Sequence, residues 1–135
     1  MMNYEIPSII QHANVFHLIG NLFCFYVLRR HWQLFPYAIP IAIMATELPV
    51  VLWNWNTLSL YIPTEPTKGL SGVVFATIGI LYGKSIHTSH SALRTFYKPL
   101  ALALIGSLIP HIDWCLHTYS LCIGFVVGTI NLKNP

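Results

Sequence analysis

Five apolar segments, separated by short polar stretches, occupy most of this 135-residue chain. Only 8% of its residues are charged, whereas an ordinary soluble domain carries about 25%. The sequence therefore predicts an integral membrane protein: an all-α, polytopic membrane helix bundle of about five transmembrane helices, forming a single domain over residues 1–135. The expected helices lie at about residues 11–28, 34–55, 70–83, 99–109 and 114–132.

The third apolar segment begins with a serine between glycines, in the sequence Gly69-Leu70-Ser71-Gly72. A helix over residues 70–83 is about 21 Å long, which is shorter than the roughly 30 Å hydrocarbon core of a bilayer. With Lys84 at one membrane face, Ser71 is predicted to lie roughly 10 Å below the other face. A hydroxyl at that depth is costly and usually has a function.

The basic residues indicate how the segments are oriented. Cytoplasmic loops of proteins in membranes carry an excess of Lys and Arg. A topology that starts outside places only Lys68 in the outer loops and the other basic residues inside, so we expect a multi-pass protein, in the cell membrane, whose polar site opens to the non-cytoplasmic side. The predicted inner residues are Arg29, Arg30, Lys84, Arg94, Lys98 and Lys133.

Three apolar segments carry polar side chains at a similar predicted depth. Counted from the nearest inner basic residue, Ser71 lies about 20 Å, His117 about 24 Å and His17 about 18 Å from the inner face. Asn21 lies four residues after His17 and shares its helix face. The sequence thus predicts a shared polar site in the outer half of the membrane.

The third and fifth segments run in the same direction, and both carry small residues every four positions, a pattern that lets helix backbones approach closely. Pairing them brings His117 to the Ser71 hydroxyl. Our hypothesis is a dyad in which His117 activates Ser71 as a general base. The small residues are Gly79 and Gly83 in the third segment, and Ser120, Gly124 and Gly128 in the fifth.

Peptide hydrolysis also needs donors for the developing oxyanion. The backbone N–H of Ser71 is expected to be available because Ser71 opens a helix. His17 and Asn21 can supply side-chain donors. Asp113 is interpreted as a helix cap or surface residue, with orientation of His117 as the alternative. Glu47 is interpreted as a partly solvated residue near a proline-broken helix end, with a functional carboxylate as the alternative.

These residues resemble those of the rhomboid intramembrane serine proteases, in three motifs that match in order and spacing over about residues 12–130. The motifs are His12-x4-His17-x3-Asn21, Gly69-Leu70-Ser71-Gly72-Val73-Val74 and Asp113-x3-His117-x6-Gly124. The resemblance implies a six-helix bundle with Ser71 as nucleophile and His117 as base. It places His17, Asn21 and the Ser71 N–H around the oxyanion, and His12 and Phe75 at a water-filled cavity that receives transmembrane protein substrates.

The sequence departs from the family pattern in three respects. The family's first span and the loop after it are missing, which indicates either a five-span form or a sequence incomplete at its start. Phe75 stands where the family has a tyrosine, so it can stack on His117 but offers no hydroxyl. Ser120 stands where the family has a glycine, and is expected to loosen the contact between the third and fifth segments.

Two other functions were weighed against proteolysis. An inactive rhomboid-like protein would bind transmembrane segments without cutting them. A metal or haem protein would use His12, His17, His111 and His117, but their spacings do not present ligands along one helix face. We expect no cofactor, no metal and no nucleic-acid partner, and neither a disulfide framework nor a zinc site from the three cysteines. His87 and His90 are interpreted as solvated loop residues.

Overall fold

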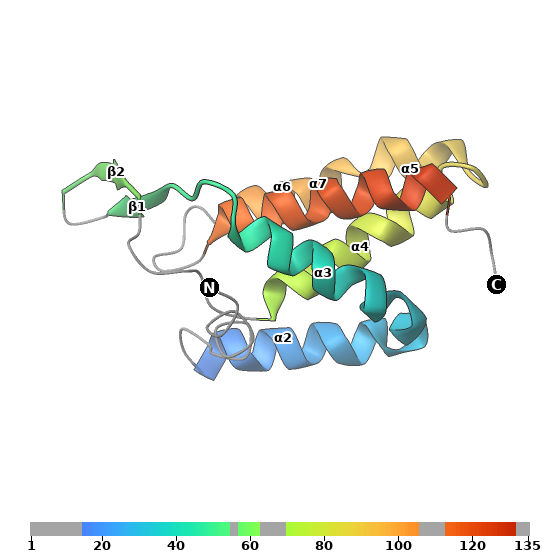
Figure 1. The fold of residues 1–135 in the computed structure, drawn as a ribbon, viewed down its shortest axis with the longest axis horizontal. Coiled ribbons are helices and arrows are strands. Elements are labelled where there is room, and N and C mark those ends of the chain that lie inside the picture. Colours follow the sequence, from blue (N-terminus) through green and yellow to red (C-terminus); the bar gives the residue numbers. More distant parts are fainter. Residues whose placement is uncertain (1–14, 55–56, 63–69, 106–112, 132–135) are drawn as a thin grey trace.

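A computed structural model describes residues 15–54, 57–62, 70–105 and 113–131, and shows a bundle of helices with a small β-hairpin at one end (Figure 1). The helical fold predicted from the sequence is confirmed. The elements are α2 (Val15–Leu28), the 3-10 helix η1 (Arg29–Leu34), α3 (Phe35–Thr46), β1 (Leu52–Asn54), β2 (Ser59–Tyr61), α4 (Ser71–Ser85), α5 (His90–Thr95), α6 (Tyr97–Ile105) and α7 (Trp114–Asn131).

Each of the five predicted apolar segments contains a helix, and the third and fifth match α4 and α7 within two residues at each end. Within the described ranges, no helix combines the length and the apolarity required to cross a membrane. The number of membrane spans therefore stays a prediction.

The second segment differs from its prediction. A helix was expected to continue to about residue 55, but α3 ends at Thr46, and the backbone N–H of Glu47 bonds to the carbonyl of Met44 at 3.2 Å. The reason is Pro49, whose ring disfavours helical geometry at the preceding residue, Leu48. Glu47 is exposed at this helix end, as expected, and its contact with water stays a prediction.

A β-hairpin follows where the rest of this helix and a loop were expected. Strands β1 and β2 pair antiparallel, with Leu52 opposite Tyr61 and Asn54 opposite Ser59. The hairpin projects beyond the end of the bundle at which α4 and α7 begin (Figure 1).

The polar stretch at residues 84–98 is also more ordered than a loop. Helix α4 continues to Ser85, α5 includes His90, and α6 begins at Tyr97, so the prediction of a loop was wrong here. His87 is exposed, as expected, but its Nε2 also lies 2.9 Å from the carbonyl oxygen of Thr129. This contact ties the end of α4 to the end of α7.

Helices α4 and α7 form the most extensive contact between described elements, and glycines line it. A β-carbon on Gly79 would collide with the carbonyl oxygen of Leu121 and lie 2.8 Å from the backbone nitrogen of Phe125. A β-carbon on Gly124 would collide with the carbonyl oxygen of Ala76 in the same way. Gly83 and Gly128 continue this contact one turn further, so the two backbones touch directly.

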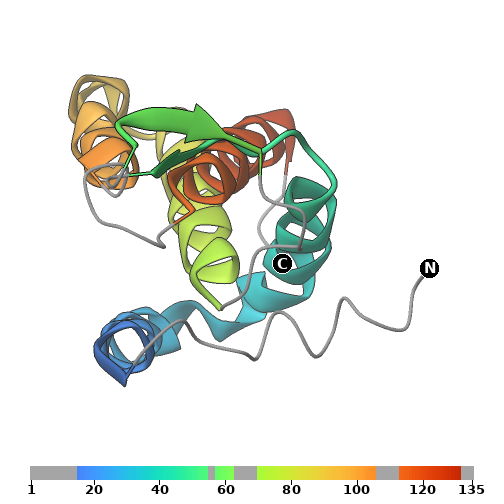
Figure 2. The ribbon, with the colours of Figure 1, turned by 90° about the vertical axis from the view of Figure 1, so that its left-hand side faces the viewer.

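The other helices surround this pair. Viewed along the bundle, α4 lies between α2 and α7, and α3 lies to one side (Figure 2). Small residues let α3 approach closely, since Ala38 and Ala42 are buried in a cluster with Val73 and Ala76 of α4. On the opposite side, Ala103 of α6 is buried in a second cluster, with Phe75 and Leu121.

The close contact between α4 and α7 predicts that a glycine-to-alanine substitution changes the free energy of unfolding in opposite directions at two positions. Gly79→Ala should lower the free energy of unfolding by about 1–3 kcal/mol, because the added methyl group meets the backbone of α7. Gly20→Ala is the matched control, since nothing lies within 4 Å of a β-carbon there and alanine favours a helix by roughly 0.5–1 kcal/mol. Thermal unfolding of the protein in detergent measures both; equal stability of the two variants would contradict this packing.

Candidate active site

Ser71 is the first residue of α4, and the chain around it explains why the helix begins there. The carbonyl oxygen of Leu70 accepts hydrogen bonds from the N–H groups of Val73 at 3.1 Å and Val74 at 3.2 Å. The N–H groups in the first turn of a helix have no acceptor within the helix. The backbone N–H of Ser71 therefore points toward the helix start and makes no intrahelical hydrogen bond. The side chain of Ser71 is buried.

His117 lies in the first turn of α7, and Asp113 fixes the position of that turn. Oδ1 of Asp113 accepts a hydrogen bond from the N–H of Leu116 at 2.9 Å, and its carbonyl accepts one from the N–H of His117 at 3.3 Å. This is the geometry of a helix N-cap. The interpretation of Asp113 as a cap is confirmed.

The ring of Phe75 stacks on His117, as its position in the sequence predicted. The ring centroids are 4.5 Å apart and the planes differ by 20°. Ser71 lies four residues before Phe75 and therefore on the same face of α4. The stack thus holds the imidazole against the face of α4 that carries the serine. No hydrogen bond joins Ser71 to His117 within the described residues, and Nε2 of His117 has no hydrogen-bond partner among them.

Helix α2 contributes the other polar residues of the predicted site. Asn21 is only 5% exposed, and its Nδ2 has no hydrogen-bond partner in the described part of the chain. His17 is half-buried and close enough to His117 for the two imidazoles to interact electrostatically. Among the described helices, α2 contacts α4, and it makes no extensive contact with α7. His12 and Gly69 lie outside the described residues.

Ser120 lies directly behind the start of α4. It is fully buried, and its Oγ would be 3.3 Å from a β-carbon on Gly72, the residue after Ser71. The missing side chain of Gly72 leaves room for this hydroxyl, which has no hydrogen-bond partner among the described residues. The sequence identified Ser120 as a member of the small-residue stripe and as a departure from the family's glycine, but not as a neighbour of Gly72.

Two contacts near the site had no counterpart in the sequence analysis. The hydroxyl of Tyr119 donates to the carbonyl oxygen of Pro49 at 2.8 Å, and Sγ of Cys115 lies 3.6 Å from the carbonyl oxygen of Val51. Cys115 and Tyr119 are four residues apart, so one face of α7 holds the segment that leads into the hairpin. The spacing alone indicates a shared helix face but not what that face binds.

The fold and the site together define a helical bundle with a buried serine and a buried histidine on two closely packed helices. The family model described as Rhomboid domain matches residues 5–134, and the chain therefore belongs to the rhomboid family. This family consists of integral membrane proteins, most of them serine intramembrane proteases and some of them inactive. Comparisons with curated proteins and with solved structures give no match.

The N-cap of α7 can be tested separately from any activity. Asp113→Ala should lower the free energy of unfolding by about 1 kcal/mol, because the N–H of Leu116 loses its acceptor. Asp113→Asn keeps an oxygen in place and should retain most of the stability. Thermal unfolding compares the two; a loss for asparagine as large as that for alanine would show that the charge matters rather than the cap.

Proposed function

We propose that this protein is an intramembrane serine endopeptidase that cleaves transmembrane-helix substrates with a Ser71–His117 dyad. The observation that carries the proposal is the stack of His117 on Phe75, one helical turn from Ser71. It supports the dyad because an imidazole held flat against α4 has little freedom to turn away from the serine on the same face. Membership of the rhomboid family supports the same chemistry.

In the proposed mechanism, Oγ of Ser71 attacks the carbonyl carbon of the scissile peptide bond while Nε2 of His117 takes the hydroxyl proton. The electron pair of the carbonyl double bond moves onto its oxygen. When the tetrahedral intermediate collapses, the C–N bond breaks and His117 delivers its proton to the leaving amine. A water molecule then hydrolyses the acyl-enzyme by the same two proton transfers in sequence.

The developing oxyanion needs hydrogen-bond donors that point at the position it will occupy. We assign this role to the N–H of Ser71 and to the side chains of Asn21 and His17. Asn21 supports the assignment because its Nδ2 is buried with no hydrogen-bond partner among the described residues, and burying an amide donor in this way is costly without a function. His12 and Phe75 would line the cavity.

We further propose that the chain is a multi-pass protein of about five spans, in the cell membrane, whose site opens to the non-cytoplasmic side. The asymmetry of the basic residues supports this orientation. The partners would then be transmembrane protein segments that enter from the surrounding bilayer. No cofactor takes part in the mechanism.

An inactive rhomboid-like protein that binds transmembrane segments is the second candidate. One observation favours it: Ser71 and His117 are not hydrogen-bonded to each other in the described part of the chain. The absence of a hydroxyl on Phe75 points in the same direction, since the family's tyrosine would supply one.

Labelling with a serine-directed fluorophosphonate separates the two candidates. Wild-type protein in liposomes should be labelled at Ser71 and should cleave a transmembrane substrate, whereas Ser71→Ala should do neither. Ser89→Ala, at a half-buried serine outside the site, is the control and should behave as wild type. An unlabelled wild type, under conditions that label an active relative, would support the inactive candidate.

The oxyanion assignment predicts a kinetic effect at Asn21. Asn21→Ala should lower kcat by about 10²–10³, the usual cost of one lost oxyanion donor, while fluorophosphonate labelling still occurs. Leu22→Ala, at the exposed neighbouring position of α2, should change kcat little. Cleavage kinetics in proteoliposomes give both values, and an unchanged kcat for Asn21→Ala would remove this residue from the mechanism.

A further inference from the structure

The β-hairpin presents large aliphatic side chains that nothing in the described structure covers. Leu58 is 69% exposed, Leu60 62% and Ile62 73%. A two-stranded hairpin is marginal by itself in water, and contiguous exposed apolar groups usually mark a contact surface. We call Leu58, Leu60 and Ile62 the hairpin patch.

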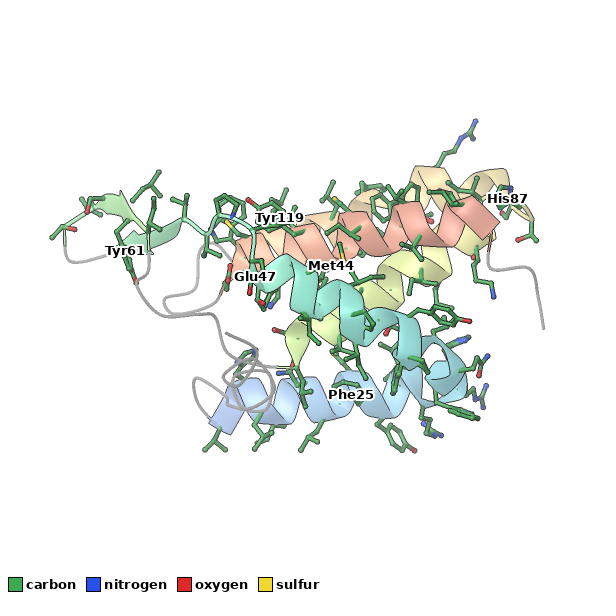
Figure 3. All side chains as sticks on the ribbon, in the orientation of Figure 1. Phe25, Met44, Glu47, Tyr61, His87 and Tyr119 are labelled. Atoms are coloured by element: carbon green, nitrogen blue, oxygen red, sulfur yellow. The ribbon has the colours of Figure 1, made fainter. Side chains whose placement is uncertain are left out.

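The direction of the patch follows from the alternation of side chains along β2. Figure 3 shows Tyr61 pointing from the hairpin toward the side of the molecule on which α2 lies. Neighbouring residues of a strand point to opposite faces, so Leu60, in the middle of β2, points away from α2. The patch therefore faces outward from the bundle and not toward the site at its centre.

The turn before β2 holds a leucine in an unfavourable backbone conformation. Leu58 has a φ of 50°, in the left-handed region that glycine and asparagine adopt easily and that a leucine adopts only with strain. A leucine in this conformation weakens the turn.

The hairpin is fixed to the bundle by α7. Tyr119 and Cys115 hold the carbonyl groups of Pro49 and Val51, just before β1. Tyr119 of α7 and Glu47, just after the end of α3, are both labelled toward the end of the bundle from which the hairpin projects (Figure 3). These contacts consequently fix the position of the hairpin patch along the axis of α7, the helix that carries His117.

We propose that the hairpin patch lies in the acyl-chain boundary of the lipid leaflet at the end of the bundle where α4 and α7 begin. The helices support a lipid occupant, because α4 is about 22 Å and α7 about 27 Å long, against a hydrocarbon core of roughly 30 Å. Helices this short do not span the whole hydrocarbon core. Either other apolar groups fill the remaining thickness at the helix ends, or the bilayer becomes thinner there.

The chemistry of the segment fits lipid better than a protein partner. Residues 48–62 contain no Asp, Glu, Lys or Arg, so nothing charged would have to enter the acyl boundary or would pair with a partner. This inference goes beyond the proposed function and holds whether or not the protein cleaves substrates.

Nitroxide accessibility on the full chain in phosphatidylcholine vesicles tests the proposal. Leu60→Cys and Ser59→Cys, matched neighbours on opposite faces of β2, are labelled in a background with Cys24→Ala, Cys115→Ser and Cys122→Ala. The label at position 60 should collide often with oxygen, which concentrates in lipid, and rarely with a water-soluble nickel complex. The label at position 59 should collide with the nickel complex more often than the label at position 60.

Frequent collisions of the label at position 60 with the nickel complex would place the patch in water and overturn the proposal. Low accessibility to both reagents would also overturn it, because a protein contact, such as a second copy of the chain, would then cover the patch. The wild-type chain gives an independent measurement that needs no substitution. A phosphatidylcholine with a photoreactive diazirine near the carbonyl end of one acyl chain should crosslink to residues 58–62, and failure to do so would contradict the lipid contact.

Discussion

The direct contact between the backbones of α4 and α7 is the interaction on which the rest of the structure depends. Gly79 and Gly83 of α4 meet Gly124 and Gly128 of α7 with no side chain between them. At this separation, Phe75 can reach the ring of His117, and Ser120 can enter the space that Gly72 leaves. A wider separation would remove both contacts, so the site is a consequence of how closely the two helices pack.

The position of His117 is determined by several weak constraints that act on one helix. Asp113 fixes where α7 begins, the glycines fix its distance from α4, and Phe75 fixes the plane of the imidazole. At the far end, His87 contacts the carbonyl of Thr129. Each constraint is worth little alone, but together they restrict the translation, the separation and the rotation of the helix that carries the proposed base.

Residue patterns were sufficient to predict those parts of the fold that depend on apolarity and on small side chains. The ends of α4 and α7 followed from the apolar runs, whereas the stack of Phe75 on His117 followed from the resemblance to the rhomboid family. The hairpin could not be predicted, because residues 48–55 are as apolar as a membrane-spanning helix. Strand β1 follows in the chain after the helix end that Pro49 causes. The contacts of Tyr119 and Cys115 were missed because their acceptors are backbone carbonyls, which no side-chain pattern reveals.

The buried polar atoms near Ser71 lower the stability of the bundle but are needed for the proposed function. Nδ2 of Asn21, Nε2 of His117 and Oγ of Ser120 come from two helices and have no hydrogen-bond partner among the described residues. A buried polar group without a partner costs about 1–3 kcal/mol, so apolar side chains at these positions would make a more stable bundle. A bundle held together by backbone contact between α4 and α7 can carry this cost, because the glycines that make the backbone contact are not the polar residues. The packing glycines and the polar residues are thus separable, which allows the site to be built for chemistry rather than for stability.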